Sequence, residues 1–343
     1  MTDPTRRWRT FAALALLLPA AGMAAAALGS VSLPAVSILA SLSGAAGLPL
    51  AGLPGLGEAG EAIFWVVRLP RVILAAIVGG GLAVVGASLQ SVFRNPMADA
   101  GLLGVGPGAA LGAVLSVRLG WSADLFLALP LAAFAGALGA ALLVYALSHA
   151  GGRPSLHGLL LTGLAVSALA GAGTSVLLVA TEEFRVKTVL FWLAGGLEGR
   201  SWPHVRLALA FIGAGVAALV LFSRPLDVLS LGEDEAAALG LPVHPARLGI
   251  LALAALVAGT ATAVAGSVPF VGLVAPHALR PLVGPLGRHL LPAAFLGGAV
   301  LVVLADLAAR TVSPHLDLPL GSLTAFVGAP YFLVALRLHE GRT

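Results

Sequence analysis

Apolar runs about twenty residues long recur along the whole 343-residue chain, and short stretches that carry its few charged residues separate them. A bilayer core about 30 Å thick needs about 20 apolar residues per helix, so these runs can cross a membrane. Only 10% of the residues are charged, whereas soluble domains carry about 25%. The sequence therefore predicts an all-α polytopic membrane protein with a single transmembrane domain over residues 1–343. The ten predicted spans are 10–30, 70–92, 100–119, 124–148, 155–180, 204–223, 247–267, 270–284, 290–311 and 318–338.

Two of these spans have unusual features. The segment 270–284 rises only about 22 Å as an α-helix, so we expect a broken or short helix buried among others, with breaks at Pro269 and Pro276. The first run, 10–30, has a basic start and ends in small residues up to Ser30. That pattern also fits a cleaved secretory signal, which would leave nine spans.

The placement of arginine predicts the orientation of the chain. Arg6, Arg7 and Arg9 precede the first span and are expected to stay in the cytoplasm. An even number of spans returns the C-terminus to the same side. Residues 31–67 then form the longest periplasmic loop, and 224–246 form the most polar cytoplasmic segment.

Segments 81–104 and 259–284 share a faint pattern. Each begins with Gly, passes a Gly/Ala/Ser stretch, meets a Pro and closes on Leu-Gly or Val-Gly. By the predicted topology their spans run in opposite directions. That is the pattern of an inverted repeat, which transporters use to build a pathway where the two repeats meet.

Several chemistries are excluded by what the chain lacks. A nucleotide-binding P-loop needs a lysine after its second glycine, but the single lysine, Lys187, follows Val186. The histidines have no metal-ligand spacing, there is no cysteine, and no paired carboxylates or serine-nucleophile motif are present, so neither a metal site nor an enzyme is expected. Basic residues do not alternate with aromatic ones, which argues against nucleic-acid binding.

Acidic residues inside spans would indicate transport driven by an ion gradient. Most of the acidic residues are assigned to loops, whereas Asp99 and Asp306 lie within or at the edge of spans. Arg310 follows Asp306 by one helical turn, so a local ion pair is expected there. A proton relay is therefore poorly supported.

Residues 232–240 are predicted to form a short helix between two long spans. Glu233, Asp234 and Glu235 favour the dipole at its N-terminus, and Gly240 ends it. The segment is either a solvated connector or a docking element for a cytoplasmic partner.

Seven motifs, in order along about residues 10–340, resemble those of the iron-chelate and cobalamin importer permeases, the membrane subunits of type II ABC importers. The motifs are Arg68-Leu-Pro-Arg71, Gly86-Ala-Ser-Leu-Gln90, Arg94-Asn-Pro-Met-Ala-Asp99 with Leu103-Gly-Val-Gly-Pro-Gly-Ala109, Gly232-Glu-Asp-Glu-Ala-Ala-Ala-Leu-Gly240, Phe270-Val-Gly-Leu-Val-Ala-Pro-His277, Ala305-Asp-Leu-Ala-Ala-Arg310 and Gly328-Ala-Pro-Tyr-Phe332.

The resemblance implies an assembly in the bacterial inner membrane. Two permease subunits would surround one pathway, and they are expected to form a homodimer. Each subunit would have ten spans and both termini in the cytoplasm. A separate cytoplasmic ATPase dimer would use ATP and Mg, and a periplasmic substrate-binding protein would dock from outside. This chain would bind no cofactor itself and would not be an enzyme.

The resemblance also assigns roles to matched positions. Arg68, Arg71 and Arg310 would meet acidic residues of the binding protein, although arginines at the edge of a membrane can simply extend toward the interface. The ATPase-coupling helix would comprise Glu233, Asp234, Glu235, Ala236, Leu239 and Gly240. The cytoplasmic gate would comprise Asn95 and Met97, where leucine is commoner than Met97 in the family. The residues Gly163, Ala165 and Ser167 would line the pathway.

The family carries ferric siderophores, haem and cobalamin. The stretch Asp99-Ala-Gly-Leu-Leu-Gly104 is more similar to members that transport tetrapyrroles, which slightly favours haem. A cobalamin importer is the alternative within the family. A transporter driven by an ion gradient is the alternative outside it, and it would require Asp99 for transport.

Overall fold

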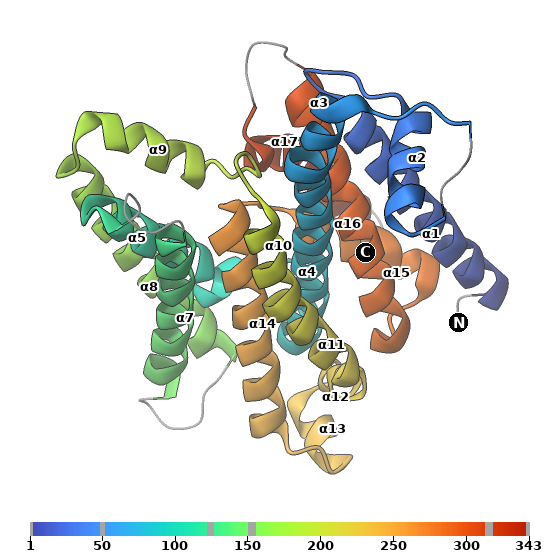
Figure 1. Ribbon diagram of the computed structural model, residues 1–343. Helices are drawn as coiled ribbons and strands as arrows, with labels where there is room; N and C mark the ends of the chain where they lie inside the picture. The colour runs from blue at the N-terminus through green and yellow to red at the C-terminus, as the bar shows by residue number, and fades with distance from the viewer. Residues whose placement is uncertain (1–2, 49–51, 122–126, 150–155, 313–317, 341–343) are drawn as a thin grey trace.

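The computed structural model describes residues 3–48, 52–121, 127–149, 156–312 and 318–340, and within these ranges every regular element is a helix (Figure 1). The all-α class is confirmed. In chain order the elements are α1 (Pro4–Ala27), α2 (Ala35–Ala45), α3 (Gly57–Ala62), the π-helical turn η1 (Ile63–Arg68), α4 (Leu69–Phe93), the 3₁₀ turn η2 (Ala100–Leu103), α5 (Val105–Arg118), α7 (Ala128–His149), α8 (Leu156–Val179), α9 (Glu183–Leu193), α10 (Trp202–Ala208), the π-helical turn η3 (Leu209–Gly213), α11 (Ala214–Leu221), α12 (Ser223–Leu229), α13 (Glu233–Ala238), α14 (Val243–Ala265), α15 (Val271–Val283), α16 (Gly287–Thr311) and α17 (Leu320–Glu340).

The predicted spans correspond to helices of two lengths. Within the described residues, seven helical segments are long and apolar enough to cross a membrane. The other three predicted spans, 100–119, 270–284 and 318–338, contain the shorter apolar helices α5, α15 and the part of α17 up to Val334. The polytopic membrane architecture is confirmed. The first residues of two predicted spans, 124–126 and 155, lie outside the described residues.

Helix α4 is the centre of the larger group of helices, which includes α1, α14, α15 and α16 (Figure 1). Most of its residues are buried, including a continuous run from Ala83 to Gln90. Small residues allow this close packing, because a Cβ added at Gly79 would overlap the carbonyl oxygen of Gly298 on α16. Association of apolar helices in a bilayer depends on such backbone contacts.

A second group, α5, α7 and α8, stands to one side of α4, and α9 extends above it (Figure 1). Glycines again allow close packing: a Cβ added at Gly108 would overlap the carbonyl oxygen of Gly136, and one added at Gly136 would overlap that of Gly108. Helix α14 packs against α7, α5 and α4 and so joins the two groups.

The predicted outer loop, 31–67, is helical over much of its length, since it contains α2, α3 and most of η1. Hydrogen bonds hold these short helices together: Trp65 Nε1 donates to Ser41 Oγ at 2.9 Å, and Ser41 Oγ donates to Glu61 at 2.7 Å. The described residues of this segment form a cap on this end of the molecule (Figure 1).

Helix α1 is an integral part of the fold. It packs along α16, and its Ala25 and Ala26 are buried.

Candidate functional site

Three arginines predicted to dock a binding protein form one cluster between α1, α4 and α16. Arg68, at the end of η1, is 5% exposed and donates to the carbonyl oxygens of Ala26 (2.6 Å) and Ala27 (2.9 Å) as well as Val31. The arginine therefore satisfies carbonyl groups at the C-terminal end of α1, which have no partners within that helix.

Asp306 on α16 lies at the middle of this arginine cluster. It is 1% exposed and accepts from Arg71 Nε at 2.9 Å (Oδ1) and 3.1 Å (Oδ2). Arg71 Nη2 lies 2.9 Å from Oδ1, and Arg310 Nε lies 3.1 Å from Oδ2. The local pair of Asp306 with Arg310 is confirmed. The partner Arg71, 235 residues away in sequence, was not predicted, because no local pattern relates the two positions.

Docking by Arg68, Arg71 and Arg310 stays a prediction. The side chains of Arg71 and Arg310 are only 16% and 10% exposed, and all three arginines are bonded within the chain. Few of their donor groups are therefore accessible on the surface of the chain.

The predicted coupling segment forms a projection at the opposite end of the molecule, where α12 and α13 meet the start of α14 (Figure 1). Asp234, Glu235 and Leu239 are exposed, whereas Ala236 is buried against the rest of the chain. Glu233 forms an ion pair with Arg247, which is buried in the first turns of α14. The projection therefore has an accessible acidic surface and a fixed connection to a membrane-spanning helix.

The two segments with the repeat pattern are in direct contact. A Cβ added at Gly86 on α4 would overlap the carbonyl oxygen of Gly272 on α15. One turn further, Gln90 Nε2 donates to that same carbonyl oxygen at 3.1 Å, and Gln90 Oε1 accepts from Arg280 at 2.9 Å. Helix α4 runs away from the α3 end of the molecule and α14 returns toward it (Figure 1), so the two segments have the opposite directions expected of an inverted repeat.

This contact explains why one predicted break in α15 is wrong. The backbone bends just after Pro269, where Phe270 has a φ of 66°, but the helix continues through Pro276. A proline cannot donate to the carbonyl four residues earlier, which here is that of Gly272. Gln90 supplies the missing donor, so Pro276 leaves no carbonyl unsatisfied and the helix is not broken there.

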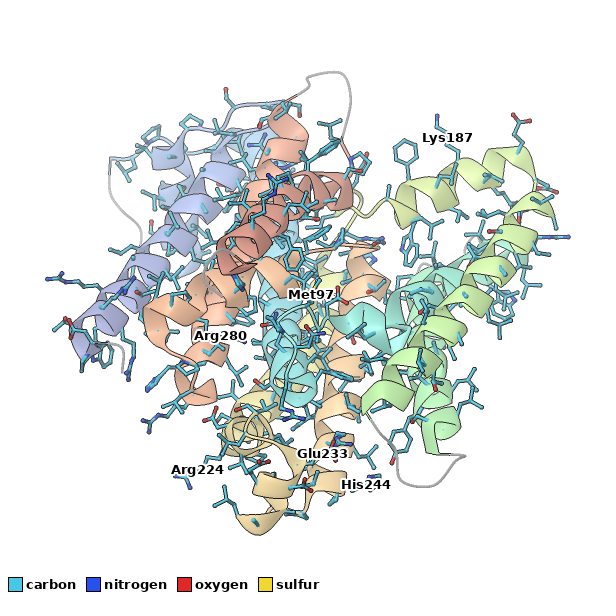
Figure 2. All side chains as sticks on the ribbon, turned by 180° about the vertical axis from the view of Figure 1, so that it is seen from behind. Met97, Lys187, Arg224, Glu233, His244 and Arg280 are labelled. Atoms are coloured by element: carbon cyan, nitrogen blue, oxygen red, sulfur yellow. The ribbon has the colours of Figure 1, made fainter. Side chains whose placement is uncertain are left out.

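The predicted gate residues form a tight turn after α4. Arg94 ends α4 in the left-handed conformation with a φ of 49°, and Asn95 Oδ1 accepts from the backbone N–H of Met97 at 2.9 Å. Met97 is half exposed, and Figure 2 places it between the α13 end, marked by Glu233, and the opposite end, marked by Lys187. Gating by these residues stays a prediction.

A cavity of about 250 Å³ lies beside this turn and is lined by residues within 99–107 and 262–272, so both repeat segments contribute. Asp99 is its acidic group and accepts from the N–H of Gly101 at 2.9 Å.

The three predicted pathway residues on α8 do not face one way. Gly163 is buried, and a Cβ added there would overlap the carbonyl oxygen of Leu102, so this position packs against η2. Ser167 is half-buried one turn later, whereas Ala165 is exposed. Pathway lining by these residues stays a prediction, with Ala165 the accessible member of the three.

The comparison with known proteins decides the family: residues 16–338 match the FecCD transport family. The chain belongs to that family. It is 42% identical over 288 residues to the cobalamin import system permease BtuC of Halobacterium salinarum, covering 84% of this chain and 77% of the relative. It is 41% identical over 281 residues to the hemin transport system permease HmuU of Yersinia pestis, covering 81% and 84%.

A solved structure supports the same assignment. The fold is similar to that of a metal-chelate type ABC transporter in an inward-facing conformation, with a TM-score of 0.84 and 30% identity over 98% of this chain and 99% of the other. The resemblance to type II importer permeases is thus confirmed, and this FecCD-family chain is a multi-pass membrane permease.

In this FecCD-family fold, sequence reasoning missed three polar residues that hold the helices together: Gln90, Arg247 and Arg280. Gln90 lies inside a motif quoted for the resemblance, Arg280 lies in the repeat segment 259–284, and Arg247 begins the predicted span 247–267. A polar side chain within an apolar span was the available signal, since such a group needs a partner in the bilayer.

Proposed function

We propose that this chain is the permease subunit of an ATP-driven importer that carries an iron chelate, with haem favoured, across the inner membrane. The single observation that carries the proposal is the family match over residues 16–338, supported by a fold that aligns over 98% of the chain. Hydrolysis of ATP would be performed by a separate ATPase dimer, and a periplasmic binding protein would deliver the cargo. Both chain ends would lie in the cytoplasm.

The coupling role of residues 233–240 has a mechanical basis in the fold. Movement of α13 would reach α14 through the ion pair of Glu233 with Arg247. The last turn of α14 contributes Thr262 to the lining of the cavity, and the residues that follow α14 continue that lining. One rigid helix thus connects the projection to the place where the repeats meet, as alternating access between two states requires.

The preference for haem rests on the 99–104 motif alone. The two relatives named above carry cobalamin and hemin, both of which are tetrapyrrole-derived macrocycles, and their identities of 42% and 41% do not separate the two cargoes. Haem is retained as the first cargo to test, and cobalamin as the second.

The second permease subunit is proposed to be another copy of this chain. Exposed apolar side chains on α17, such as Phe326 and Val327, and on α8, such as Leu164, give the molecule apolar surface beyond what its own packing covers. Lipid could cover the same surface, so the mass of the assembled complex tests this part of the proposal.

Transport in proteoliposomes tests the function. The chain, an ATPase and a binding protein encoded beside it would be reconstituted, and uptake of haem, a ferric siderophore and cobalamin would be measured with ATP, or with a proton gradient and no ATP. ATP-dependent haem uptake that exceeds that of the other two cargoes is expected. ATP-dependent uptake that is greatest for cobalamin would identify cobalamin, and not haem, as the cargo. Uptake driven by the gradient alone, and lost in Asp99→Asn, would refute the importer.

A further inference from the structure

Basic residues gather where α1 and α16 begin, in a part of the molecule that the proposed transport mechanism does not use. We call this group the basic patch, and it consists of Arg6, Arg7 and Arg9 on α1 and Arg288 and His289 on α16. Arg6, Arg9 and Arg288 are exposed, while Arg7 and His289 are half-buried.

Contacts between the two helices hold the patch together. Arg7 Nη1 lies 2.7 Å from His289 Nε2, and α1 packs along α16 beyond this point. The backbone N–H of Gly287, at the first position of α16, donates to Asp227 on α12 at 2.6 Å. The start of α16 is therefore fixed between α1 and α12.

The positive charge of the patch is not paired within the described residues, where no carboxylate forms an ion pair with Arg6, Arg7, Arg9 or Arg288. Asp227 offsets part of this charge, since it acts on Arg288 and His289 while its Oδ1 accepts from the N–H of Gly287.

Asp3, just before α1, is the other acid nearby, and two carboxylates against four arginines leave the patch with a net positive charge. The Asp3 carboxylate accepts from the N–H and the hydroxyl of Thr5 as the N-cap of α1. At the outer end of the molecule, by contrast, Arg71 and Arg310 share the buried Asp306. Neighbouring cations repel one another unless an anion lies between them, so the patch is suited to an anion from outside the chain.

The surroundings of the patch point to a lipid as the source of that anion. Trp8, between Arg7 and Arg9, is 74% exposed, and exposed Leu16 and Leu17 continue the apolar surface of α1. Tryptophan is enriched at the level of lipid headgroups, where its ring is partly in the apolar layer. Basic side chains at that level between membrane helices bind anionic headgroups.

We propose that the basic patch binds the phosphate of an anionic phospholipid, with Arg7 and Arg288 as its principal ligands, and that the lipid holds α1 against α16. The cytoplasmic leaflet is assigned from the proposed orientation of the chain. Binding itself does not depend on that orientation or on the cargo, so its test is separate from the test of transport.

The purified full-length chain in a neutral detergent tests the proposal. Phosphatidylglycerol or phosphatidylcholine would be titrated, with bound lipid counted by native mass spectrometry and the unfolding temperature followed. Phosphatidylglycerol is expected to bind and to raise the unfolding temperature, and phosphatidylcholine to do neither. An arginine near an anionic surface contributes about fivefold in affinity. The double variant Arg7→Gln with Arg288→Gln should therefore bind phosphatidylglycerol about 30-fold more weakly.

Two further variants make the result decisive. Arg118→Gln with Arg206→Gln removes the same charge from exposed positions elsewhere and should bind like the parent chain. Arg7→Lys with Arg288→Lys keeps the charge and should retain most of the binding, which provides a folded comparison if the Gln variant does not fold. Three results would each overturn the proposal. The Arg7/Arg288 Gln variant could bind phosphatidylglycerol as well as the parent chain does, or the Arg118/Arg206 control could lose as much binding as that variant. Glycerol phosphate, which has no acyl chains, could also stabilise the chain as much as phosphatidylglycerol does.

Discussion

Replacing Asp306 with Asn isolates the contribution of charge in the outer arginine cluster. Asparagine has nearly the same volume, but it leaves Arg71 and Arg310 without the carboxylate that they share at 2.9 and 3.1 Å. Both arginines are largely buried, so water cannot replace the lost partner. Removing one member of a buried ion pair costs about 3–5 kcal/mol, because the remaining charge is left uncompensated.

This cost can be measured as a change in unfolding temperature in detergent, followed by tryptophan fluorescence. Unfolding entropy of about 2.1 cal/mol/K per residue gives about 0.7 kcal/mol/K for a chain of this length, so each kcal/mol lowers the temperature by about 1.4 °C. The variant should therefore unfold about 4–7 °C lower. Membrane helices that stay formed after unfolding reduce this entropy, which makes the shift larger.

The matched control is Glu182→Gln, which breaks the ion pair with Arg185 at 3.1 Å. These side chains are 65% and 34% exposed, and exposed pairs contribute about 0–1 kcal/mol. The control should shift the unfolding temperature by about 1 °C or less. Equal shifts in the two variants would refute the argument that burial makes the Asp306 cluster stabilising.

Three other outcomes are expected. Gly86→Ala forces a methyl group against the carbonyl oxygen of Gly272 and should lower the free energy of unfolding by about 1–3 kcal/mol. Gly139 has open space around it, so Gly139→Ala should leave stability unchanged or raise it slightly in the same unfolding assay. The double variant Asp234→Lys with Glu235→Lys changes only exposed charges on α13. It should reduce association with the ATPase without lowering the unfolding temperature. Unchanged ATPase association and transport would contradict the coupling role. Arg68→Gln should weaken docking of the binding protein more at low than at high salt, measured on chain that remains folded, and docking indifferent to salt would count against an electrostatic role.

The sequence predicted the class of this protein because the deciding signal is local. A run of about 20 apolar residues is long enough to span a bilayer wherever it occurs in the chain. The ion pair of Asp306 with Arg310 was predictable for the same reason, since residues four apart lie on one face of a helix. The family motifs were likewise readable as short strings of residues.

The arrangement of the helices, and the polar contacts between them, were decided only by the tertiary structure. Gln90 replaces the donor that Pro276 lacks, and Arg71 reaches Asp306 across 235 residues. Neither contact has a local signature, because each depends on how closely two helices approach. That approach is set by small residues such as Gly86, whose partners in space are not written in the sequence around them.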